Sequence, residues 1–567
     1  MSSRLWPLLL ACLVFLLGAG AADARERPNI LVIMTDDQTV QDLRVMPQTR
    51  ALLADQGTTF TNSFVSFSLC CPSRATLFTG QYAPNHRVLG LTPPAGGYVK
   101  LDTSNYLPLW LQDAGYRTLH LGKFLNGYGS QNPDPTDVPP GFDEWEGSID
   151  PTTYNYTDYT LNENGRLVRY GPGAEYQTDF YAQRASELIE RYARDERPFF
   201  FSLAFVAPHY GRPVEPDDPL FFQTPAVAPR HRDRFAATPL PRTPDFNERD
   251  VSNKPWRIRH YSLLSFDEIF ELQELYQQRL ESLLAVDEGV GRVVEALRST
   301  GELDNTLILF TSDNGYMIGQ HRVRAAKVFG YEPSIRVPLI LRGPGVPTGA
   351  RRKQLVTNAD LSPTILAAAE GRARKPQDGR ALQPLLADSG LEWGRNLFVQ
   401  GRGTHLTFNA LRTPRYFYAH YRNGNVELYD LKRDPFELKN LNREHRYAPL
   451  RKQLQRQLKR LRRCRGRSCY SGPRLRLGLR PNVGCVPGAL GVRMVGRDLQ
   501  RVRRAGFYLR GRRVARAQAT LAGQSRLLST SGVRPGRRFR LRVRVTLNDG
   551  QVVTLDRTRR ACAGAAP

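Results

Sequence analysis

Three continuous apolar runs along the chain each end at a cluster of polar residues. Residues 29–34 lead into Thr35-Asp36-Asp37, residues 199–205 into Ala207-Pro208-His209, and residues 306–310 into Ser312-Asp313-Asn314-Gly315. Strands without polar alternation are typical of a parallel sheet buried on both faces. Ligands of such sheets collect beyond the carboxyl ends of the strands. We therefore expect an α/β fold, with a mainly parallel central sheet flanked by helices and one functional site at this edge.

Helical spacing of apolar residues appears between the expected strands, at residues 178–194 and 267–300. Residues 216–257 are rich in proline and polar side chains, which predicts a long loop over the body and a wall of the substrate cleft. Residues 416–421 and 426–431 are short β-rich runs around Asn423-Gly424-Asn425, a hairpin signal in a smaller unit.

The C-terminal part follows a different pattern. A basic helical segment is followed, after Cys469, by short alternating runs split by glycine and proline, which predict a small antiparallel β-sandwich. Within it, Arg538, Arg540, Arg542 and Arg544 alternate with apolar residues and are expected to form an arginine ladder on one solvent face. The expected units are a signal peptide (1–24), the α/β domain (25–370), a small subdomain (371–445), a basic helical linker (446–468) and a basic all-β domain (469–567).

Charge is distributed unevenly between these units. The chain of 567 residues has a net charge of +27, yet residues 451–567 hold 31 Lys and Arg against three acids, a net +28 that leaves −1 for the rest. A near-neutral body therefore carries a basic appendage, and nucleic-acid binding does not follow for the whole protein. The appendage lacks zinc-finger or helix-turn-helix spacing, and Tyr508 and Phe539 are expected in its core, so we expect no specific nucleic-acid partner. Its basic side chains would suit a polyanion, or they reflect a compositional bias toward arginine.

The first 24 residues resemble an export signal. Arg4 precedes an apolar run at residues 5–17 that is too short for a membrane span, and cleavage is expected after Ala24. A lipidated Cys12 is the alternative. We expect an exported protein, periplasmic, at the cell surface or secreted, with no transmembrane segment.

Four cysteines lie in the basic part: Cys464, Cys469, Cys485 and Cys562. In an exported chain they predict two disulfides, with three possible connectivities. No histidine accompanies them, which disfavours a zinc site.

The most specific motif is CCPSRATLFTG at residues 70–80. Its Cys-x-Pro-Ser-Arg core followed by Thr-Gly resembles the signature of the sulfatase family, and the resemblance extends over about residues 27–445. It is closest to the N-acetylglucosamine-6-sulfatase and extracellular heparan sulfatase branch. The resemblance implies an alkaline-phosphatase-like fold and the oxidation of Cys70 to formylglycine by a formylglycine-generating enzyme.

The resemblance also implies a metal site, with Asp36, Asp37, Asp313, Asn314 and the modified Cys70 as ligands. Three carboxylates and one amide oxygen form a hard, oxygen-only donor set that suits Ca²⁺ or Mg²⁺ better than zinc. From the family's usage we expect one Ca²⁺, in preference to Mg²⁺.

Four cationic or imidazole groups complete the implied site: Arg74, Lys123, His209 and Lys327. They would surround a sulfate anion with positive charge, and His209 or Lys327 would protonate the leaving oxygen. Two positions depart from the common pattern, since Leu125 and Met317 stand where many sulfatases have histidine. They leave open which base resets the nucleophile.

The implied activity is hydrolysis of a sulfate ester on a sulfated sugar or an aryl sulfate, so the expected partner is a sulfated small molecule or polysaccharide. A hydroxyl of hydrated formylglycine would attack sulfur, and the second hydroxyl would let sulfate leave as the aldehyde re-forms. Two alternatives remain: a phosphodiesterase or phosphonate hydrolase of the same superfamily, and an inactive exported polyanion-binding protein.

Overall fold

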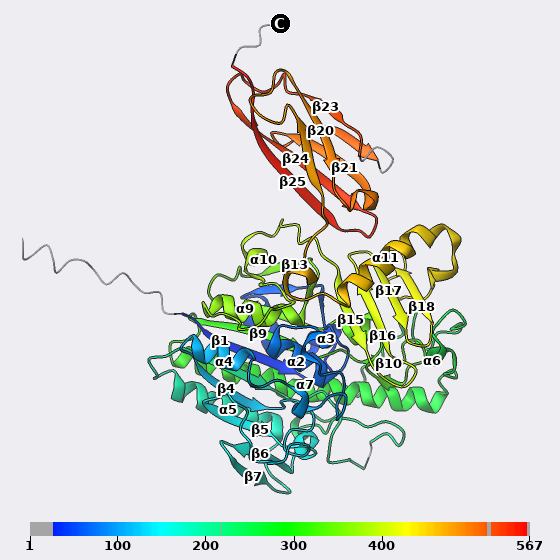
Figure 1. Cartoon of the computed structure of the whole chain (residues 1–567). Coiled ribbons are helices and arrows are strands. Elements are labelled where there is room, and N and C mark those ends of the chain that lie inside the picture. The colour runs from blue at the N-terminus through cyan, green and yellow to red at the C-terminus, as the bar shows by residue number, and fades with distance from the viewer. Residues whose placement is uncertain (1–26, 217, 519–522, 564–567) are drawn as a thin grey trace, which may run out of the picture.

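The computed structural model describes residues 27–216, 218–518 and 523–563, so the expected signal peptide lies outside the described residues. Figure 1 shows a large α/β body below and a separate β domain above it. Within the described residues, no helix has the length and apolar character needed to cross a membrane.

A ten-stranded sheet forms the centre of the body, with the order β13-β2-β12-β9-β1-β8-β4-β5-β6-β7. Its middle strands β9, β1, β8, β4 and β5 run parallel, as the unbroken apolar runs predict. Antiparallel pairs flank them on both sides. The bounds are β1 Asn29–Thr35, β2 Thr58–Phe60, β4 Arg117–Gly122, β5 Glu144–Ser148, β6 Tyr159–Glu163, β7 Arg166–Tyr170, β8 Phe199–Ala204, β9 Thr306–Ser312, β12 Leu339–Arg342 and β13 Ala350–Arg352.

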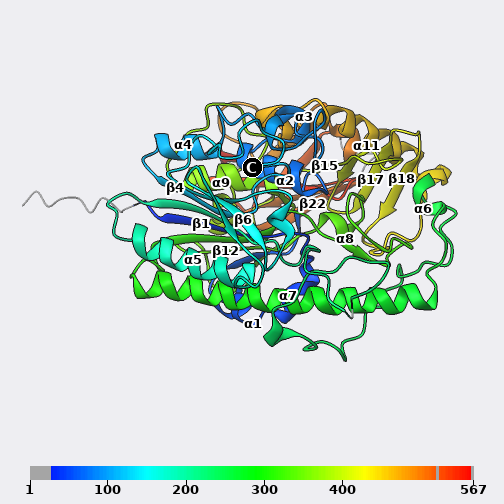
Figure 2. The same ribbon diagram turned by 90° about the horizontal axis from the view of Figure 1, so that it is seen from below.

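Helices cover both faces of this sheet. On one face lie α5 (Gln177–Tyr192) and α7 (Phe266–Ser299), which pack against each other and match the two predicted helices. Figure 2 shows α7 as one long helix that crosses the width of the body. The other face is covered by α2 (Cys70–Thr79), α4 (Leu107–Asp113) and α9 (Leu361–Ala368), whose apolar side chains share one core with the sheet. The predicted α/β fold is confirmed.

The smaller unit is an antiparallel sheet of β15 (Leu397–Gly401), β16 (Phe408–Arg412), β17 (Tyr416–Tyr421) and β18 (Val426–Asp430). The predicted hairpin is β17–β18. Helix α11 (Ala448–Leu461) lies within the segment expected as a linker and buries Leu454, Leu458 and Leu461 against this sheet.

The C-terminal domain is the predicted sandwich. A three-stranded sheet β19-β20-β23 packs on a four-stranded sheet β22-β21-β24-β25 around one apolar core. The arginine ladder on β24 is exposed as expected and Phe539 is buried, but the expectation for Tyr508 was wrong, because its ring lies half-exposed on the outer side of β21. The bounds are β19 Arg476–Arg480, β20 Ala489–Val495, β21 Val502–Leu509, β22 Arg512–Gln518, β23 Arg526–Ser529, β24 Arg538–Leu547 and β25 Val552–Arg560.

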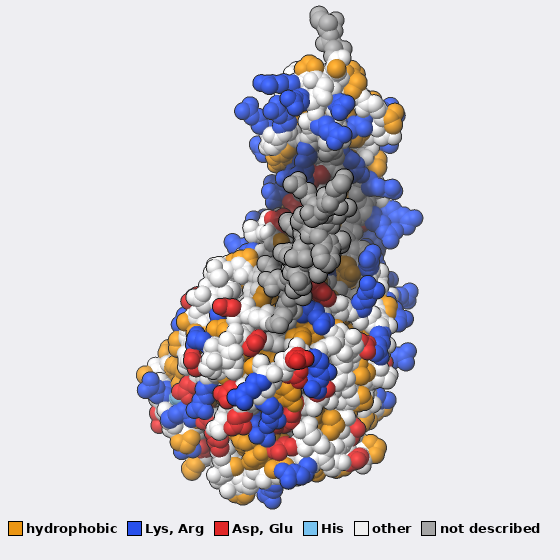
Figure 3. Space-filling model, turned by 90° about the vertical axis from the view of Figure 1, so that its left-hand side faces the viewer, with side chains coloured by type: hydrophobic (Ala, Val, Ile, Leu, Met, Phe, Trp, Pro, Cys, Tyr) orange, Lys and Arg blue, Asp and Glu red, His pale blue; other side chains and the backbone are white. Residues whose placement is uncertain are grey.

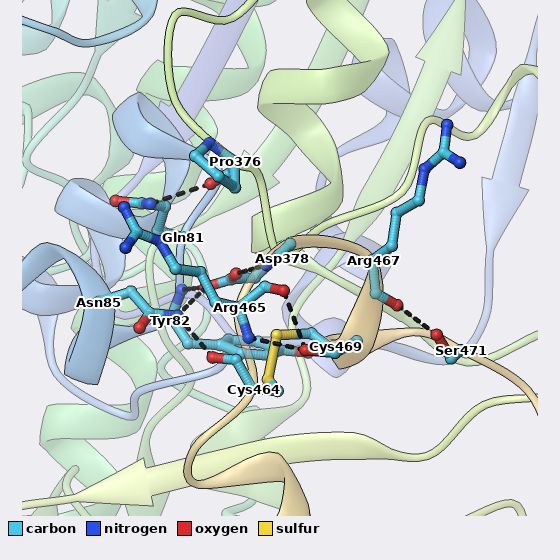
Figure 4. The surroundings of a disulfide bond; sticks show 12 residues. Gln81, Tyr82, Asn85, Pro376, Asp378, Cys464, Arg465, Arg467, Cys469 and Ser471 are labelled. Carbon is cyan, nitrogen blue, oxygen red and sulfur yellow. Dashed lines mark hydrogen bonds between the residues drawn. A yellow bond between two sulfur atoms is a disulfide. The ribbon is translucent and has the colours of Figure 1, made fainter.

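Of the three possible connectivities, the structure has Cys464–Cys469 and Cys485–Cys562. The first disulfide closes a small loop that docks just after the helix bearing Cys70 (Figure 4). There Asp378 accepts hydrogen bonds from the backbone amides of Tyr82 and Gly466. Asn85 also donates to the carbonyl of Cys464 at 2.9 Å. The loop therefore joins the end of α11 to the α/β body.

Candidate active site

The carboxyl ends of four neighbouring parallel strands bring the predicted site residues together. Asp36 and Asp37 follow β1, Asp313 and Asn314 follow β9, Lys123 follows β4, and His209 comes five residues after β8. All six side chains are buried. The predicted location of the site at this edge of the sheet agrees with the geometry.

The candidate metal ligands are linked to one another by hydrogen bonds. The backbone amide of Asp37 donates to Asp313 Oδ1 at 3.2 Å, and Asn314 Nδ2 donates to Asp37 Oδ1 at 2.6 Å. Asp37 has a φ of 69°, a left-handed conformation that few non-glycine residues adopt. A strained backbone at this point is consistent with a side chain held in place for function.

Cys70 is the first residue of α2, and its thiol donates to Asn126 Oδ1 at 3.2 Å. The helix ends at Gly80, whose φ of 63° satisfies the left-handed conformation common at helix C-termini. Cys70 is buried, and burial raises the pKa of its thiol, so the unmodified side chain is a neutral thiol near pH 7. Cys71, its neighbour, is also buried and free.

Positive groups surround the thiol and the carboxylates. Lys327 Nζ lies 2.6 Å from Asp37 Oδ1 and 3.8 Å from Cys70 Sγ. Arg74 Nε donates to Asp313 Oδ2 at 2.7 Å, and Lys123 Nζ donates to Asp36 Oδ2. His209 Nε2 lies 3.8 Å from Asp37 Oδ2. Four cationic or imidazole side chains thus converge on three carboxylates.

Burial and neighbouring charges set the protonation of these groups. Burial opposes ionisation of Asp36, yet the cations led by Lys123 outweigh it and hold its pKa far below the usual range. Burial likewise opposes the charged forms of Lys123 and Lys327, but nearby carboxylates raise both pKa values well above normal. Burial, followed by the charge of Lys327, lowers the pKa of His209 to about 4. Near neutral pH, therefore, both lysines are charged and His209 is neutral.

The donor set fits a hard cation. Buried oxygens of three predicted ligands, Oδ1 of Asp36, Oδ2 of Asp37 and Oδ1 of Asn314, have no hydrogen-bond partner. Ligand atoms of Asp36, Cys70 and Asp313 lie within 4.8 Å of one another, as do those of Asp36, Asp37 and His209. Unpaired buried oxygens are costly unless a cation or a donor satisfies them. Together these atoms form an oxygen-rich cradle suited to Ca²⁺ or Mg²⁺.

Two positions that depart from the common pattern are apolar core residues in this fold. Leu125 packs beside Phe124 in the main core, and Met317 is fully buried in a second cluster. Asn126, the residue after Leu125, contacts Cys70 instead. Its Nδ2 donates to the hydroxyl of Tyr154 at 2.6 Å.

The sequence did not single out Asn126 or Tyr154 for a role. The ring of Tyr154 lies 4.8 Å from Lys123 Nζ and 4.7 Å from the His209 ring. Arg279 was also missed. Its guanidinium donates to the carbonyl oxygens of Asp37 at 2.6 Å and Pro208 at 2.9 Å, and so ties together the ends of β1 and β8. The sequence signal for this residue is an arginine at the helical spacing of the apolar residues of α7, four residues from both Leu275 and Leu283.

The long loop expected at residues 216–257 is present, and its described residues include two short helical segments. It lines a cavity of about 540 Å³ together with Tyr316 and Arg279. None of the predicted ligands or sulfate-contacting side chains lines this cavity. The role of the loop at residues 216–257 as a wall of the substrate cleft stays a prediction.

Comparison with known proteins agrees with this geometry. The sulfatase family model matches residues 28–371, and the model of the C-terminal part of N-sulphoglucosamine sulphohydrolase matches residues 319–464. The chain is 34% identical to an arylsulfatase of Volvox carteri over 516 residues, 81% of this chain and 78% of that protein. It is 35% identical to human N-acetylglucosamine-6-sulfatase over 404 residues, 68% of this chain and 70% of that protein.

A solved structure extends the similarity to the fold. The structure of BT4656 in complex with its substrate D-glucosamine-2-N,6-O-disulfate has a TM-score of 0.62 and 25% sequence identity, covering 76% of this chain and 97% of that one. The family models, the two curated relatives and the shared fold lead to one conclusion: the chain belongs to the sulfatase family and is a sulfuric ester hydrolase.

Proposed function

We propose that this protein hydrolyses sulfate esters of sugars, with Cys70 converted to formylglycine and Ca²⁺ held by Asp36, Asp37, Asp313 and Asn314. The single observation that carries the proposal is the convergence of four cationic or imidazole side chains on three carboxylates next to Cys70. The Cys70 sulfur lies 3.8 Å from Lys327 Nζ and within 4.8 Å of ligand atoms of Asp36 and Asp313. A sulfated glucosamine is the favoured substrate class, since the human relative is an N-acetylglucosamine-6-sulfatase and the substrate in the BT4656 structure is a sulfated glucosamine.

Modification of Cys70 is part of the proposal because the unmodified side chain is poorly suited to attack. A buried neutral thiol is a weak nucleophile. Once formed, hydrated formylglycine supplies an oxygen nucleophile and a second hydroxyl that lets sulfate depart. A formylglycine-generating enzyme is therefore a required partner during maturation, and export is expected to follow.

The surrounding residues bind and orient the substrate anion. Arg74, Lys123 and Lys327 place positive charge around Cys70, where it lowers the cost of bringing a nucleophile to an anionic ester. Bound Ca²⁺ would add positive charge that polarises the ester oxygens. Arg279 keeps Asp37 and the segment before His209 in register through their backbone carbonyls.

Of the two candidate proton donors, Lys327 is favoured. It is charged near neutral pH and lies 3.8 Å from the Cys70 sulfur, whereas His209 is neutral there. We therefore assign to Lys327 the proton that passes to the leaving alcohol, and to His209 a hydrogen bond within the site.

The phosphodiesterase or phosphonate hydrolase alternative is not favoured, because the curated relatives above are sulfatases. An inactive protein is disfavoured by the complete set of charged groups.

The test is a panel of substrates with purified protein co-produced with a formylglycine-generating enzyme. The panel contains N-acetylglucosamine 6-sulfate, N-sulfoglucosamine, 4-nitrophenyl sulfate and a phosphate diester. The proposal expects sulfate release from the 6-sulfate, lost in Cys70→Ala and kept in Cys71→Ala. Faster cleavage of the phosphate diester, or equal turnover by Cys70→Ala, would overturn it.

A further inference from the structure

A groove of about 710 Å³ lies where the small subdomain, α11 and the β-sandwich meet, and none of its lining residues belongs to the active site. Six cationic side chains from all three parts line it, and no carboxylate does: Arg415, Arg433, Arg446, Lys452, Arg456 and Arg503. Like charges gathered in one groove repel one another, and this repulsion is relieved when an anion binds there.

Most of these cations lack an acidic partner. Arg415 pairs with Asp430 and Arg446 with Glu444. Within the described parts of the chain, the other four make no ion pair, and all four are exposed. They are available to a ligand.

The arginine ladder on β24 differs in this respect. Arg540 and Arg542 share Asp556, and Arg544 pairs with Glu392 of the small subdomain. Three of its four members are thus partly neutralised. Figure 3 shows basic side chains gathered over the sandwich while acidic and basic side chains mix over the body, so total charge alone does not locate a binding site.

The groove also contains an unpartnered buried donor. Gln453 on α11 is only 6% exposed, and its Nε2 has no hydrogen-bond partner. Its Oε1 accepts from Asn548 Nδ2 of the sandwich at 3.5 Å. A buried amide donor beside free cations is suited to an oxygen-rich ligand.

The sandwich side of the groove is held rigidly. Buried Asp549 accepts hydrogen bonds from Arg501 at 2.6 Å and from Asn396 and Gln457 at 3.2 Å. Arg503 and Asn548 are within two residues of this network along the chain. The fused domain therefore completes the groove with a fixed geometry.

We propose that this groove binds a segment of sulfated polysaccharide, apart from the active site. Guanidinium groups match the oxygen geometry of sulfate, and amide side chains suit sugar hydroxyls. The choice of a sulfated saccharide over other polyanions rests on the proposed function, since the proposed substrates are sulfate esters of sugars. Binding there would hold the polymer near the enzyme and raise the local concentration of sulfate esters.

The test measures the affinity of the full chain for heparin, a highly sulfated polysaccharide, at physiological salt. All proteins carry Cys70→Ala, so that no desulfation occurs and the result does not depend on the proposed catalytic function. The groove variant combines Arg433→Gln, Arg456→Gln and Arg503→Gln. The matched control removes the same charge from exposed strand positions elsewhere on the sandwich through Arg512→Gln, Arg516→Gln and Arg538→Gln.

We expect the groove variant to weaken binding at least about tenfold and the control less than about twofold, because charged hydrogen bonds to the ligand are lost only in the first. Equal losses in both variants would show diffuse attraction and overturn the proposal, as would no loss in either. Tighter binding of single-stranded DNA, or equal binding of an unsulfated uronic polymer, would overturn the assignment to sulfate. If circular dichroism shows that the triple variant is unfolded, the heparin affinity of the exposed single variant Arg456→Gln is measured instead. About a threefold loss of affinity is expected for it. The same groove changes with Cys70 intact should leave turnover of 4-nitrophenyl sulfate unaltered.

Discussion

The ammonium nitrogen of Lys327 lies 3.8 Å from the sulfur of Cys70, although 257 residues separate them in the chain. The same nitrogen lies 2.6 Å from Asp37. One cation therefore bridges the candidate nucleophile and a candidate metal ligand, which is the position that the proposed proton donor requires.

Replacing Lys327 tests this role through the leaving group. Lys327→Met should lower kcat for a sugar sulfate by about 10²–10⁴-fold, because an alcohol of high pKa needs a proton as it departs. The loss should be much smaller for 4-nitrophenyl sulfate, whose leaving group is stable as an anion. Steady-state kinetics on the two substrates give the comparison. Equal losses on both would assign Lys327 to sulfate binding alone.

Asp37→Asn tests the metal site without requiring turnover. Asparagine tolerates the left-handed backbone at this position, so the fold should survive while the ligand charge is lost. In the unaltered protein, Ca²⁺ at about 100 times its Kd should add about 2.7 kcal/mol of stability. Thermal unfolding with Ca²⁺, Mg²⁺ or a chelator measures this gain. It should disappear in Asp37→Asn and persist in the surface control Asp158→Asn, whereas a gain retained in Asp37→Asn would place the metal elsewhere.

Glu281 on α7 predicts a pH dependence of stability. Burial raises its pKa to about 7 from a normal 4.5, and its carboxylate accepts from the amide of Phe235 in the long loop. Because the folded state keeps this proton at a pH where the unfolded state releases it, stability should fall as pH rises from about 4.5 through 7.

Glu281→Gln keeps the acceptor and removes the titration. Its stability relative to the unaltered protein should therefore increase between pH 5 and pH 8. Urea unfolding at both pH values measures the difference. A constant difference at the two values would contradict the raised pKa.

Asp549→Asn tests the attachment of the β-sandwich. The change leaves buried Arg501 with Asp498 as its remaining acidic partner. Breaking a buried pair from one side costs about 3 kcal/mol or more. Denaturant unfolding should show this loss, together with faster proteolysis between the two domains. The half-buried surface control Asp556→Asn should cost less than about 1 kcal/mol. If Asp549→Asn and Asp556→Asn both lower the unfolding free energy by the same small amount, the network around Asp549 contributes little to stability.

The sequence predicted the parallel sheet and the edge that carries the site, because buried strands leave unbroken apolar runs with polar ends. The order of residues in the motif around Cys70 was sufficient to predict the family. Asn126 and Arg279 escaped prediction, since their roles depend on contacts that the fold makes between distant segments. The pairing of the four C-terminal cysteines was equally undetermined, because spacing alone allows every connectivity.

The groove beside α11 shows the same limit. Arginine content predicted a basic domain, and alternation predicted the ladder on β24. Only the packed structure shows that acids neutralise much of the ladder while a groove built from three units keeps unpaired cations.

The most direct test of the account is the mass of the peptide that bears Cys70, taken from active protein. The account predicts a loss of about 18 Da at Cys70, from thiol to aldehyde, with no change at Cys71. Turnover should rise in proportion to the converted fraction across preparations. Full sulfatase activity in protein whose Cys70 is an unmodified thiol would contradict the account.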